Sequence, residues 1–213
     1  MIGVMSGTSL DGIDIALTEI HRNKVSVIDF YHINYAKKVK ENILKLHFQN
    51  NNELENSNVL SNELAKLTGK AINRLLKKNN LIPSQIKGVG YHGQTVRHKP
   101  DKGYSIQIGN ADLLAEITHL DIVSNFRNRD IAAKGQGAPL VPIGEQLLFP
   151  EFNWCLNLGG FANISSEENN CRIAFDICPV NIVLNKYVGV LGFDYDDKGI
   201  LARKGNYHDQ LFN

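Results

Sequence analysis

The sequence predicts an α/β protein of two lobes, mainly because one pattern of elements occurs twice. A short apolar strand, a tight turn, two further strands and a helix follow one another from Met1, and the same order restarts at Trp154. The first copy continues with more helices and strands, whereas the second stops early. We therefore expect mixed sheets with flanking helices, with a whole lobe at residues 1–148 and the beginning of a second, truncated lobe at residues 149–213.

Short gaps between the first three apolar runs favour an antiparallel meander. These strands are expected at Met1–Met5, Ile13–Ile20 and Val25–Tyr35. Helical spacing then predicts a helix around Val39–Leu46 that ends in the Asn-rich "QNNNELENSN", and a second helix over Leu60–Leu75 with Ser57 or Asn58 as its cap. The later expected elements are strands in "IKGVGYHG", "YSIQIG" and "DIVSNF", a helix at "ADLLAEIT", the polar loop "RNRDIAAKGQGAPLVP" and a helix at Ile143–Phe149.

The second lobe is expected to begin with strands at "WCLNLGG", "FANIS" and "CRIAFDI". Pro179 suits the first position of a helix, and apolar residues continue over Ile182–Leu191. Two such lobes would form a cleft, with the turn after each first strand pointing into it.

The totals exclude several classes of partner. The 213 residues carry a formal net charge of +1, so no bulk attraction to nucleic acid or to a membrane is expected. No apolar run approaches the roughly 18 residues of a membrane span, and the N-terminus lacks the layout of a signal peptide. Three cysteines, Cys155, Cys171 and Cys178, fit reduced thiols in a cytoplasmic protein better than a disulfide framework.

The first turn, "SGTSLDG" at residues 6–12, is longer than a simple chain reversal needs. Gly-rich turns expose backbone N–H groups and let a ligand approach closely, which suits phosphate oxygens. The hydroxyls of Thr8 and Ser9 would add further donors. A solvated hairpin with Asx-type turn bonds is the alternative.

Six segments resemble, in order and spacing, the anhydro-N-acetylmuramic acid kinases. They are "GVMSGTSLDGIDIAL", "GYHGQTVRHKP", "IQIGNADLLAEIT", "VSNFRNRDIAAKGQGAPLVP", "LNLGGFANIS" and "AFDICPVN". That family is part of the superfamily of actin, the sugar kinases and a class of heat-shock chaperones, so the resemblance implies actin-like ATPase (ribonuclease H-like) lobes. It also implies a reaction of cytoplasmic cell-wall recycling. The internal 1,6-anhydro bridge of a murein-derived sugar is opened by water, and O6 is phosphorylated from Mg-ATP to give N-acetylmuramate 6-phosphate.

The resemblance implies ATP and Mg²⁺ as cofactors, bound by the first loop and by the turn of the second lobe. The residues concerned are Gly7, Thr8, Ser9, Leu10, Asp11, Gly12, Ile13, Asp14, Asn157, Gly159 and Gly160. Asp11 or Asp14 would hold Mg²⁺, which takes oxygen ligands and keeps several waters. For the second turn, a bare Gly-Gly hairpin is the alternative.

The sugar side of the cleft is expected to include His92, Gln94, Arg127, Arg129 and Asp130. One arginine would meet the lactyl carboxylate of the sugar, which a guanidinium fork matches. His92 and Gln94 would hydrogen-bond sugar hydroxyls. The alternatives are a buried structural histidine and an internal salt-bridge cluster.

Asp176 is the expected catalytic base, because opening the anhydro bridge requires a proton acceptor for the attacking water. The alternative is a helix cap at the helix expected near Pro179. The family's Asp-Thr-Gly-Pro-Gly-Asn reads Asp-Ile-Cys-Pro-Val-Asn here, so Ile177, Cys178 and Val180 change the backbone's access to a ligand.

Family members are longer, and the part without a counterpart here would carry most of the adenosine site. We therefore expect a kinase whose chain is inactive as given, with a non-catalytic nucleotide- or sugar-binding fragment as the alternative. A chaperone domain has no support, because "GQGAPLVP" resembles the kinases. A missing half-domain leaves apolar surface uncovered, so a homodimer is a further expectation.

Overall fold

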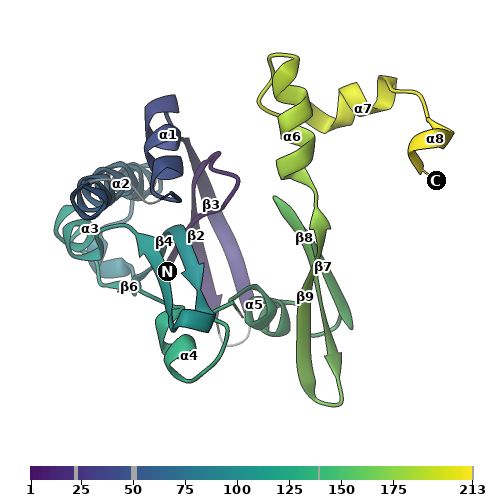
Figure 1. Ribbon diagram of the computed structural model, residues 1–213. Coiled ribbons are helices and arrows are strands. Elements are labelled where there is room, and N and C mark those ends of the chain that lie inside the picture. Colours follow the sequence, from purple (N-terminus) through teal and green to yellow (C-terminus); the bar gives the residue numbers. More distant parts are fainter. Residues whose placement is uncertain (22–23, 49–51, 139, 213) are drawn as a thin grey trace. The chain divides into compact units, whose positions relative to one another are not determined.

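A computed structural model describes residues 1–21, 24–48, 52–138 and 140–212 (Figure 1). The chain forms two compact units, Met1–Glu151 (unit 1) and Phe152–Asn213 (unit 2), and we describe each by itself. Part of the Asn-rich end predicted for the first helix falls on residues 49–51, outside the described residues, as does residue 139 of the long polar loop.

The described strands of unit 1 form one mixed sheet in the order β3-β2-β1-β4-β5, with β6 also paired to β4. Their bounds are β1 Ile2–Ser6, β2 Gly12–His21, β3 Lys24–Asn34, β4 Val89–Lys99, β5 Tyr104–Ile108 and β6 Ile122–Ser124. The first three strands pair antiparallel, as the short gaps predicted, and β1 then pairs parallel with β4. The parallel pair places the loop after β1 beside the middle of β4, where Ser6 is the register partner of Gln94.

Helices cover one face of this sheet (Figure 1). These are α1 Lys37–Lys45, α2 Glu53–Lys78 and α3 Ala111–Thr118. Later in unit 1 come α4 Asn128–Ala132 and α5 Leu140–Leu148. Short 3₁₀ turns lie at Pro83–Gln85 and Pro100–Lys102. Helix α2 contacts β2, β3 and β5, and it is flanked by α1 and α3.

The core of unit 1 lies between these helices and the sheet. Alternate residues of β2, namely Ile13, Ile15 and Leu17, are buried against Leu64 and Ile72 of α2 and their neighbours. Each such side chain contributes about 1.5–3 kcal/mol through its removal from water. Apolar residues recur every second position in the strand and about every 3.6 positions in the helix, so each element has one apolar face that packs on the other.

The prediction for the start of α2 is wrong. The helix begins at Glu53, so Ser57 and Asn58 are interior residues whose side chains donate hydrogen bonds to the Leu54 carbonyl. Asn52, in the left-handed region at φ +62°, precedes the helix without a side-chain cap bond. Glu53 and Glu55 favour a start here because acidic side chains stabilise the first turn of a helix.

Unit 2 is a three-stranded antiparallel sheet in the order β7-β8-β9, followed by helices. The bounds are β7 Trp154–Leu158, β8 Phe161–Glu168, β9 Cys171–Pro179, α6 Asn181–Val190, a 3₁₀ turn at Asp197–Gly199, α7 Ile200–Lys204 and α8 Asp209–Phe212. Pro179 is the last residue of β9, and α6 starts at Asn181, so the predicted helical position of Pro179 is wrong.

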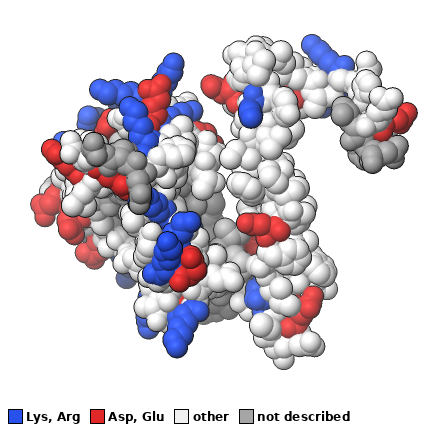
Figure 2. All heavy atoms as spheres, viewed as in Figure 1, with Lys and Arg blue, Asp and Glu red and all other residues white. Residues whose placement is uncertain are grey.

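The register gives the sheet of unit 2 two different faces, since side chains alternate along each strand. Its apolar face carries Trp154, Leu156 and Leu158 of β7, Ile164 of β8, and Ile173 and Phe175 of β9. Its polar face carries Cys155, Asn157, Asn163, Ser165, Ala174 and Asp176. Long stretches of unit 2 are uncharged in the view of Figure 2, whereas Lys, Arg, Asp and Glu are frequent over unit 1. Among the described helices, none combines the length and the apolar character of a membrane span.

Candidate functional site

The loop between β1 and β2 is held in place by one buried side chain. Leu10 adopts φ +54°, an unusual value for a residue with a Cβ, and its side chain is only 6% exposed. Its N–H donates to the Gly7 carbonyl at 3.3 Å, which closes a turn. Burial of Leu10 therefore fixes the loop while Thr8 and Ser9 remain exposed at its tip.

The end of this loop requires glycine at position 12. A Cβ there would collide with the backbone of Ile33 on β3. The next residue, Ile13, is 2% exposed and points into the core, so only its backbone is available to a ligand. Of the predicted cofactor-binding residues, Leu10 and Ile13 thus act by shaping the loop.

Asp11 holds the hydroxyl of Ser9 in the loop. Its Oδ1 accepts hydrogen bonds from Ser9 Oγ at 2.7 Å and from the Gly12 N–H at 3.0 Å. These are the Asx-type bonds of a structured turn. A phosphate that accepted the Ser9 hydroxyl proton would have to replace the first of these bonds.

Asp14 lies on β2 directly after the loop and pairs with His32 of β3. The Asp14 Oδ1 to His32 Nδ1 distance is 2.7 Å, and His32 Nε2 lies 3.0 Å from Asn34 Oδ1. The bond to Asp14 raises the pKa of His32 above its ordinary value, since both ring nitrogens face acceptor oxygens. Asp14 therefore has the His32 imidazole as its partner, whereas Asp11 is bonded to groups of its own loop.

The two carboxylates fit the chemistry of a Mg²⁺ site. Mg²⁺ is commonly bound by one or two carboxylates, with waters and substrate phosphates supplying the other ligands. Asp11 is exposed, and the Asp14 side chain is 48% exposed. No cluster of three or more His, Cys, Asp or Glu side chains that could hold a metal occurs in the described parts of the chain. An ion here would therefore depend on phosphate oxygens for part of its shell.

Strand β4 supports the loop from the neighbouring position. Ser6 Oγ donates to the Gly93 carbonyl at 2.8 Å, and Gln94 Nε2 donates to the Gly7 carbonyl at 3.1 Å. The Gln94 side chain is 0% exposed and also lies 3.4 Å from the Tyr35 hydroxyl. Burial raises the pKa of Tyr35 to about 12, so the hydroxyl keeps its proton and donates. In the described structure Gln94 positions the loop, and its predicted contact with a sugar stays a prediction.

His92 holds an arginine. Its Nδ1 lies 2.7 Å from the Gly93 carbonyl, an acceptor, so the proton is on Nδ1 and Nε2 accepts from Arg127 Nε at 3.1 Å. Burial lowers the pKa of His92, and the nearby charge of Arg127 acts in the same direction. His92 is therefore neutral at pH 7 and fixes the plane of the guanidinium.

Arg127 and Asp130 fasten the loop that follows α4. Arg127 Nη1 donates to the Gly137 carbonyl at 2.6 Å, and the Gly137 N–H donates to Asp130 Oδ2 at 2.6 Å. Arg127 and Asp130 thus meet through this backbone, and the salt-bridge alternative is not the arrangement seen. Arg127 is half-buried and Arg129 is exposed.

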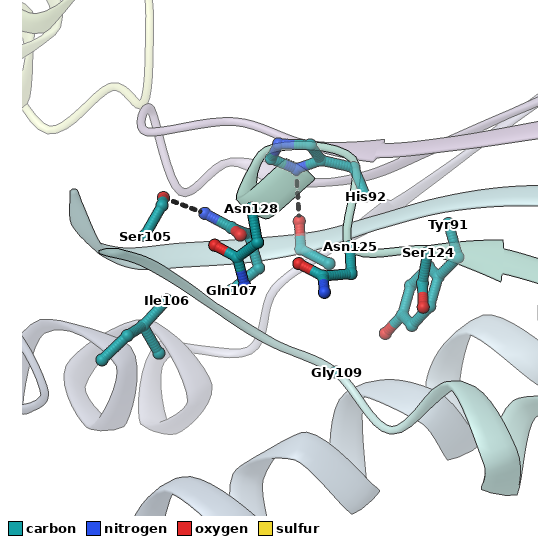
Figure 3. Close-up of a pocket in the computed structure, with 10 residues that line it drawn as sticks. Tyr91, His92, Ser105, Ile106, Gln107, Gly109, Ser124, Asn125 and Asn128 are labelled. Carbon is teal, nitrogen blue, oxygen red and sulfur yellow. Dashed lines mark hydrogen bonds between the residues drawn. The ribbon is translucent and has the colours of Figure 1, made fainter. Parts of the chain in front are cut away.

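A cavity of about 340 Å³ opens beside His92 (Figure 3). It is lined by Tyr91, His92, Gly93, Ser105, Ile106, Gln107, Gly109, Ser124, Asn125 and Asn128. Most of these groups are uncharged hydrogen-bonding side chains, and Gln107 Nε2 donates to Ser105 Oγ at 2.6 Å. Neutral polar linings suit hydroxyl and amide groups of a ligand.

Sequence reasoning missed five polar residues of this lining: Ser105, Gln107, Ser124, Asn125 and Asn128. Two signals were present. Ser105 and Gln107 alternate along the strand "YSIQIG", and Ser124 and Asn125 come at and after the end of the strand "DIVS". Pairing of β5 and β6 with the same strand β4 brings the two groups together.

In unit 2 the register places Asp176 in a row with two asparagines. Asn157 on β7 pairs with Asn163 on β8, which pairs with Asp176 on β9. Adjacent strands lie about 4.8 Å apart, so these three polar residues form one band on the polar face. Asn163 is the member that was not among the predicted site residues.

Asp176 does not cap the helix. It lies inside β9, and the residue before α6 is Val180, which has no side-chain cap bond. The cap interpretation is therefore wrong, and the exposed carboxylate is available for another role.

The Gly159–Gly160 turn is tied to the start of α6 through its carbonyls. Gly160 O accepts from the N–H groups of Val180 (2.9 Å) and Ile182 (3.3 Å), and Gly159 O accepts from Asn181 (3.3 Å). These bonds fix the turn relative to the helix even though Val180 replaces the glycine of the family pattern.

A hydroxyl-rich loop fixed by a buried anchor and a polar cavity in a mixed α/β unit are features typical of proteins that bind small polar molecules. The family model for anhydro-N-acetylmuramic acid kinase matches residues 1–213. The chain belongs to the anhydro-N-acetylmuramic acid kinase family.

Curated relatives with the same name agree with this result. The chain is 40% identical to a protein of Pseudomonas syringae pv. syringae over 215 residues, which cover 99% of this chain and 59% of the relative. For Nitrosospira multiformis the identity is 39%, covering 96% of this chain and 58% of the relative. For Neisseria meningitidis serogroup C it is 40%, covering 100% and 60%. The chain thus spans about three fifths of the length of these relatives.

Proposed function

We propose that this chain supplies the phosphate loop, the sugar-binding side chains and the catalytic base of an anhydro-N-acetylmuramic acid kinase. Such a kinase opens the 1,6-anhydro bond with water and phosphorylates O6 from ATP. The family match over residues 1–213 carries the proposal. The sheet order with an antiparallel β2 supports actin-like lobes, and we propose a cytoplasmic reaction.

Asp176 would act as the general base in this reaction. Its carboxylate accepts a proton from a water molecule as the water oxygen bonds to the anomeric carbon of the sugar. The bond between that carbon and O6 breaks, and O6 attacks the terminal phosphorus of ATP, which releases ADP. The position of Asp176 in the polar band of unit 2, away from any helix cap, supports this role.

The first loop would bind the phosphates through its amides and the hydroxyls of Thr8 and Ser9. When bound, Mg²⁺ neutralises part of the phosphate charge. Asp11 is the better placed carboxylate to contact the ion, since Asp14 is paired with His32. In unit 2, Asn157 and the Gly159–Gly160 turn would provide the second set of polar contacts.

Arg127 would bind the lactyl carboxylate of the sugar. It is half-buried, its pKa is lowered by burial, and its side chain donates to the neutral His92 and to the Gly137 carbonyl. A buried cation without a nearby acid gains most from an anionic ligand. Arg129 is exposed and is the weaker candidate. The neutral cavity next to His92 would take the hydroxyl and acetamido groups.

The test uses the 213-residue chain joined to the part of the Pseudomonas syringae pv. syringae relative that has no counterpart in it. We expect this completed protein to convert 1,6-anhydro-N-acetylmuramic acid and Mg-ATP to N-acetylmuramate 6-phosphate, detected by mass spectrometry. Asp176→Asn should lower turnover by about 10²–10⁴-fold while sugar binding survives. Glu168→Gln, a matched change in the same sheet, should leave turnover unchanged.

Two results would contradict the proposal. Parental turnover in the Asp176→Asn protein would move the base elsewhere. Binding of sugar or nucleotide without any turnover in the completed protein would favour the alternative, a non-catalytic binding fragment of the same fold.

A further inference from the structure

Strands β1 and β4 exchange hydrogen bonds between the side chains of one and the backbone beside the other. Ser6, the last residue of β1, donates through Oγ to the Gly93 carbonyl of β4 at 2.8 Å. Gln94 of β4 donates through Nε2 to the carbonyl of Gly7, the residue after β1, at 3.1 Å. Both side chains are buried, so water does not compete for these two bonds. We call them the crossed bonds, because each strand supplies the side chain that holds a carbonyl of the other segment.

Each of the two carbonyls also accepts a second hydrogen bond from its own segment. The Gly93 oxygen accepts from His92 Nδ1 at 2.7 Å, a bond that is dashed in Figure 3. The Gly7 oxygen accepts from the Leu10 N–H at 3.3 Å. A carbonyl oxygen has two lone pairs, so one local donor and one crossing donor use its full capacity. Loss of a crossing donor therefore loosens the acceptor on which the local donor depends.

An extra residue in β4 makes the crossed bonds possible. The register advances by two residues in β1, from Val4 to Ser6, and by three in β4, from Tyr91 to Gln94. Such a bulge reverses the alternation of the two faces beyond it, which is why Gln94 is buried as Tyr91 is. Gly93, inside the bulge, adopts φ +71°, and a Cβ there would lie 2.7 Å from the backbone of β5. Glycine is therefore required where the carbonyl turns toward Ser6.

The two crossed bonds lead to different parts of the candidate site. The Gly93 carbonyl holds the Nδ1 proton of His92, whose Nε2 accepts from Arg127 Nε at 3.1 Å. Ser6 is therefore linked to the arginine proposed for the sugar carboxylate. The Gly7 carbonyl belongs to the loop proposed for phosphate, so Gln94 is linked to that loop. The place of each residue in the sequence indicates the opposite assignment.

We propose that Ser6 is a positioning residue for the sugar and that Gln94 is a positioning residue for the nucleotide. Ser6 acts on the guanidinium through the Gly93 carbonyl and His92, although it directly precedes the phosphate loop. Gln94 acts on that loop through the Gly7 carbonyl, although it follows the histidine of the sugar side by two residues. The proposal rests on the proposed function for the identity of the two ligands, whereas the crossed bonds belong to the chain itself.

The first experiment measures the KM of each substrate in the completed protein, in which the 213-residue chain is joined to the rest of the Pseudomonas syringae pv. syringae relative. Ser6→Ala should raise the KM for 1,6-anhydro-N-acetylmuramic acid by about five- to tenfold, because one buried hydrogen bond is lost. The KM for Mg-ATP should stay within about twofold of the parental value, and kcat should change little, since only binding common to ground and transition state is weakened. Gln94→Met should give the reverse, with a higher KM for Mg-ATP and a nearly unchanged KM for the sugar.

Thr118 of α3 provides a matched control. Its hydroxyl is buried and donates to the Leu114 carbonyl at 2.8 Å, the length of the bond from Ser6. Thr118→Val should lower the thermal transition of unit 1 about as much as Ser6→Ala and leave both KM values unchanged. A general loss of stability would move the two KM values together, so it could not produce the crossed result.

The second experiment measures hydrogen exchange by NMR on the 213-residue chain without any ligand. Ser6→Ala should speed exchange of the Arg127 Nε–H by at least about fivefold and leave exchange of the Leu10 N–H unchanged. Gln94→Met should speed exchange of the Leu10 N–H and leave exchange of the Arg127 Nε–H unchanged. These rates test the crossed bonds whether or not the proposed reaction is correct.

The outcomes separate this proposal from the proposed function. A rise in the KM for Mg-ATP in Ser6→Ala, or a rise of the same KM in both variants, would overturn the crossed assignment. A completed protein without turnover would count against the proposed function, and the exchange rates would then decide alone. Unchanged exchange of the Arg127 Nε–H in Ser6→Ala would overturn the proposal, whereas faster exchange in that variant alone would uphold it.

Discussion

Unit 1 and unit 2 start with the same order of elements, a three-stranded antiparallel meander followed by a helix. Among the residues that the structure describes, however, the large buried apolar side chains all belong to unit 1. In unit 1 the alternate residues Ile13, Ile15 and Leu17 of β2 are covered by α2. In unit 2 the alternate residues Trp154, Leu156 and Leu158 of the first strand, β7, are exposed. Alternation sets which residues share a face, and a covering layer decides whether that face is buried.

The turns after the first strand of each unit also differ, because only the turn of unit 1 is fixed by buried side chains. The loop of unit 1 is fixed by side chains, with Leu10 in the core and Gln94 bonded to Gly7. The turn of unit 2 is fixed by backbone bonds from the start of α6 to Gly159 and Gly160. A side-chain anchor depends on a core, whereas a backbone anchor needs only the next element.

The largest expected effect on stability separates the two units directly. Ile15→Ala removes a side chain that is 0% exposed and should cost about 3–5 kcal/mol of unfolding free energy. Leu156→Ala, at 57% exposure, should stay within about 0.5 kcal/mol. Urea unfolding followed by circular dichroism at 222 nm measures both, and similar costs would mean that unit 2 is covered in solution.

Substitutions of Leu10 test whether the loop of unit 1 depends on a buried side chain, unlike the turn of unit 2. Leu10→Ala should cost about 2–3 kcal/mol, because it empties a buried position. Leu10→Gly removes one carbon atom more but relieves the cost of φ +54°, so it should be no more destabilising than Leu10→Ala. Phe161→Ala, after the turn of unit 2 and 42% exposed, should change stability little. If Leu10→Gly were clearly the worst of the three, burial alone would not account for the loop.

The smallest expected effect is on the stability of unit 1 at low pH. Hydrogen bonds from Lys78 and then Asn79 and the Phe30 N–H lower the pKa of Asp29 from 3.8 to about 2. A lowered native pKa gives stability that is present above the unfolded value and is lost as the pH falls toward the native one. Asp29→Asn should therefore flatten the dependence of the unfolding midpoint of unit 1 on pH between about 4 and 2.

Asp196 of unit 2 provides the contrast. Its pKa is also lowered, chiefly by the N–H groups of Leu201 and Ala202. Because this contact lies within unit 2, Asp196→Asn should leave the midpoint of unit 1 unchanged at every pH. A shift in that midpoint would mean that the two units unfold together.

Much of unit 1 was predictable, because the spacing of its apolar residues and the turn residues between its elements indicate the same helices and strands. The meander, the apolar face of α2 and the first half of β4 follow from spacing, although β4 runs on past His92 to Lys99. The start of α2 was not, since the Asn-rich composition of its first turns is typical of loops while Glu53 and Glu55 favour a helix. Pro179 misled for a similar reason, because a proline also suits the end of an edge strand.

For the candidate site, residue type alone led to the loop hydroxyls and Asp176, and their roles stay predictions. Residue type did not indicate positions that depend on pairing between distant strands. The lining residues Ser105 and Asn125 meet only because β5 and β6 share β4. The role of Gln94 depends on a bond across 87 residues of sequence, which no local pattern indicates.

The core of unit 1 uses residues of Met1–Glu151 alone, and this has a consequence for synthesis of the protein. Domains generally fold as units, N-terminal first, while the ribosome is still translating. Unit 1 can therefore fold as soon as it leaves the exit tunnel. The strands of unit 2 emerge later, and Trp154, Leu156 and Leu158 of β7 are exposed. During that interval, we expect nascent chains to be held by chaperones at β7–β9.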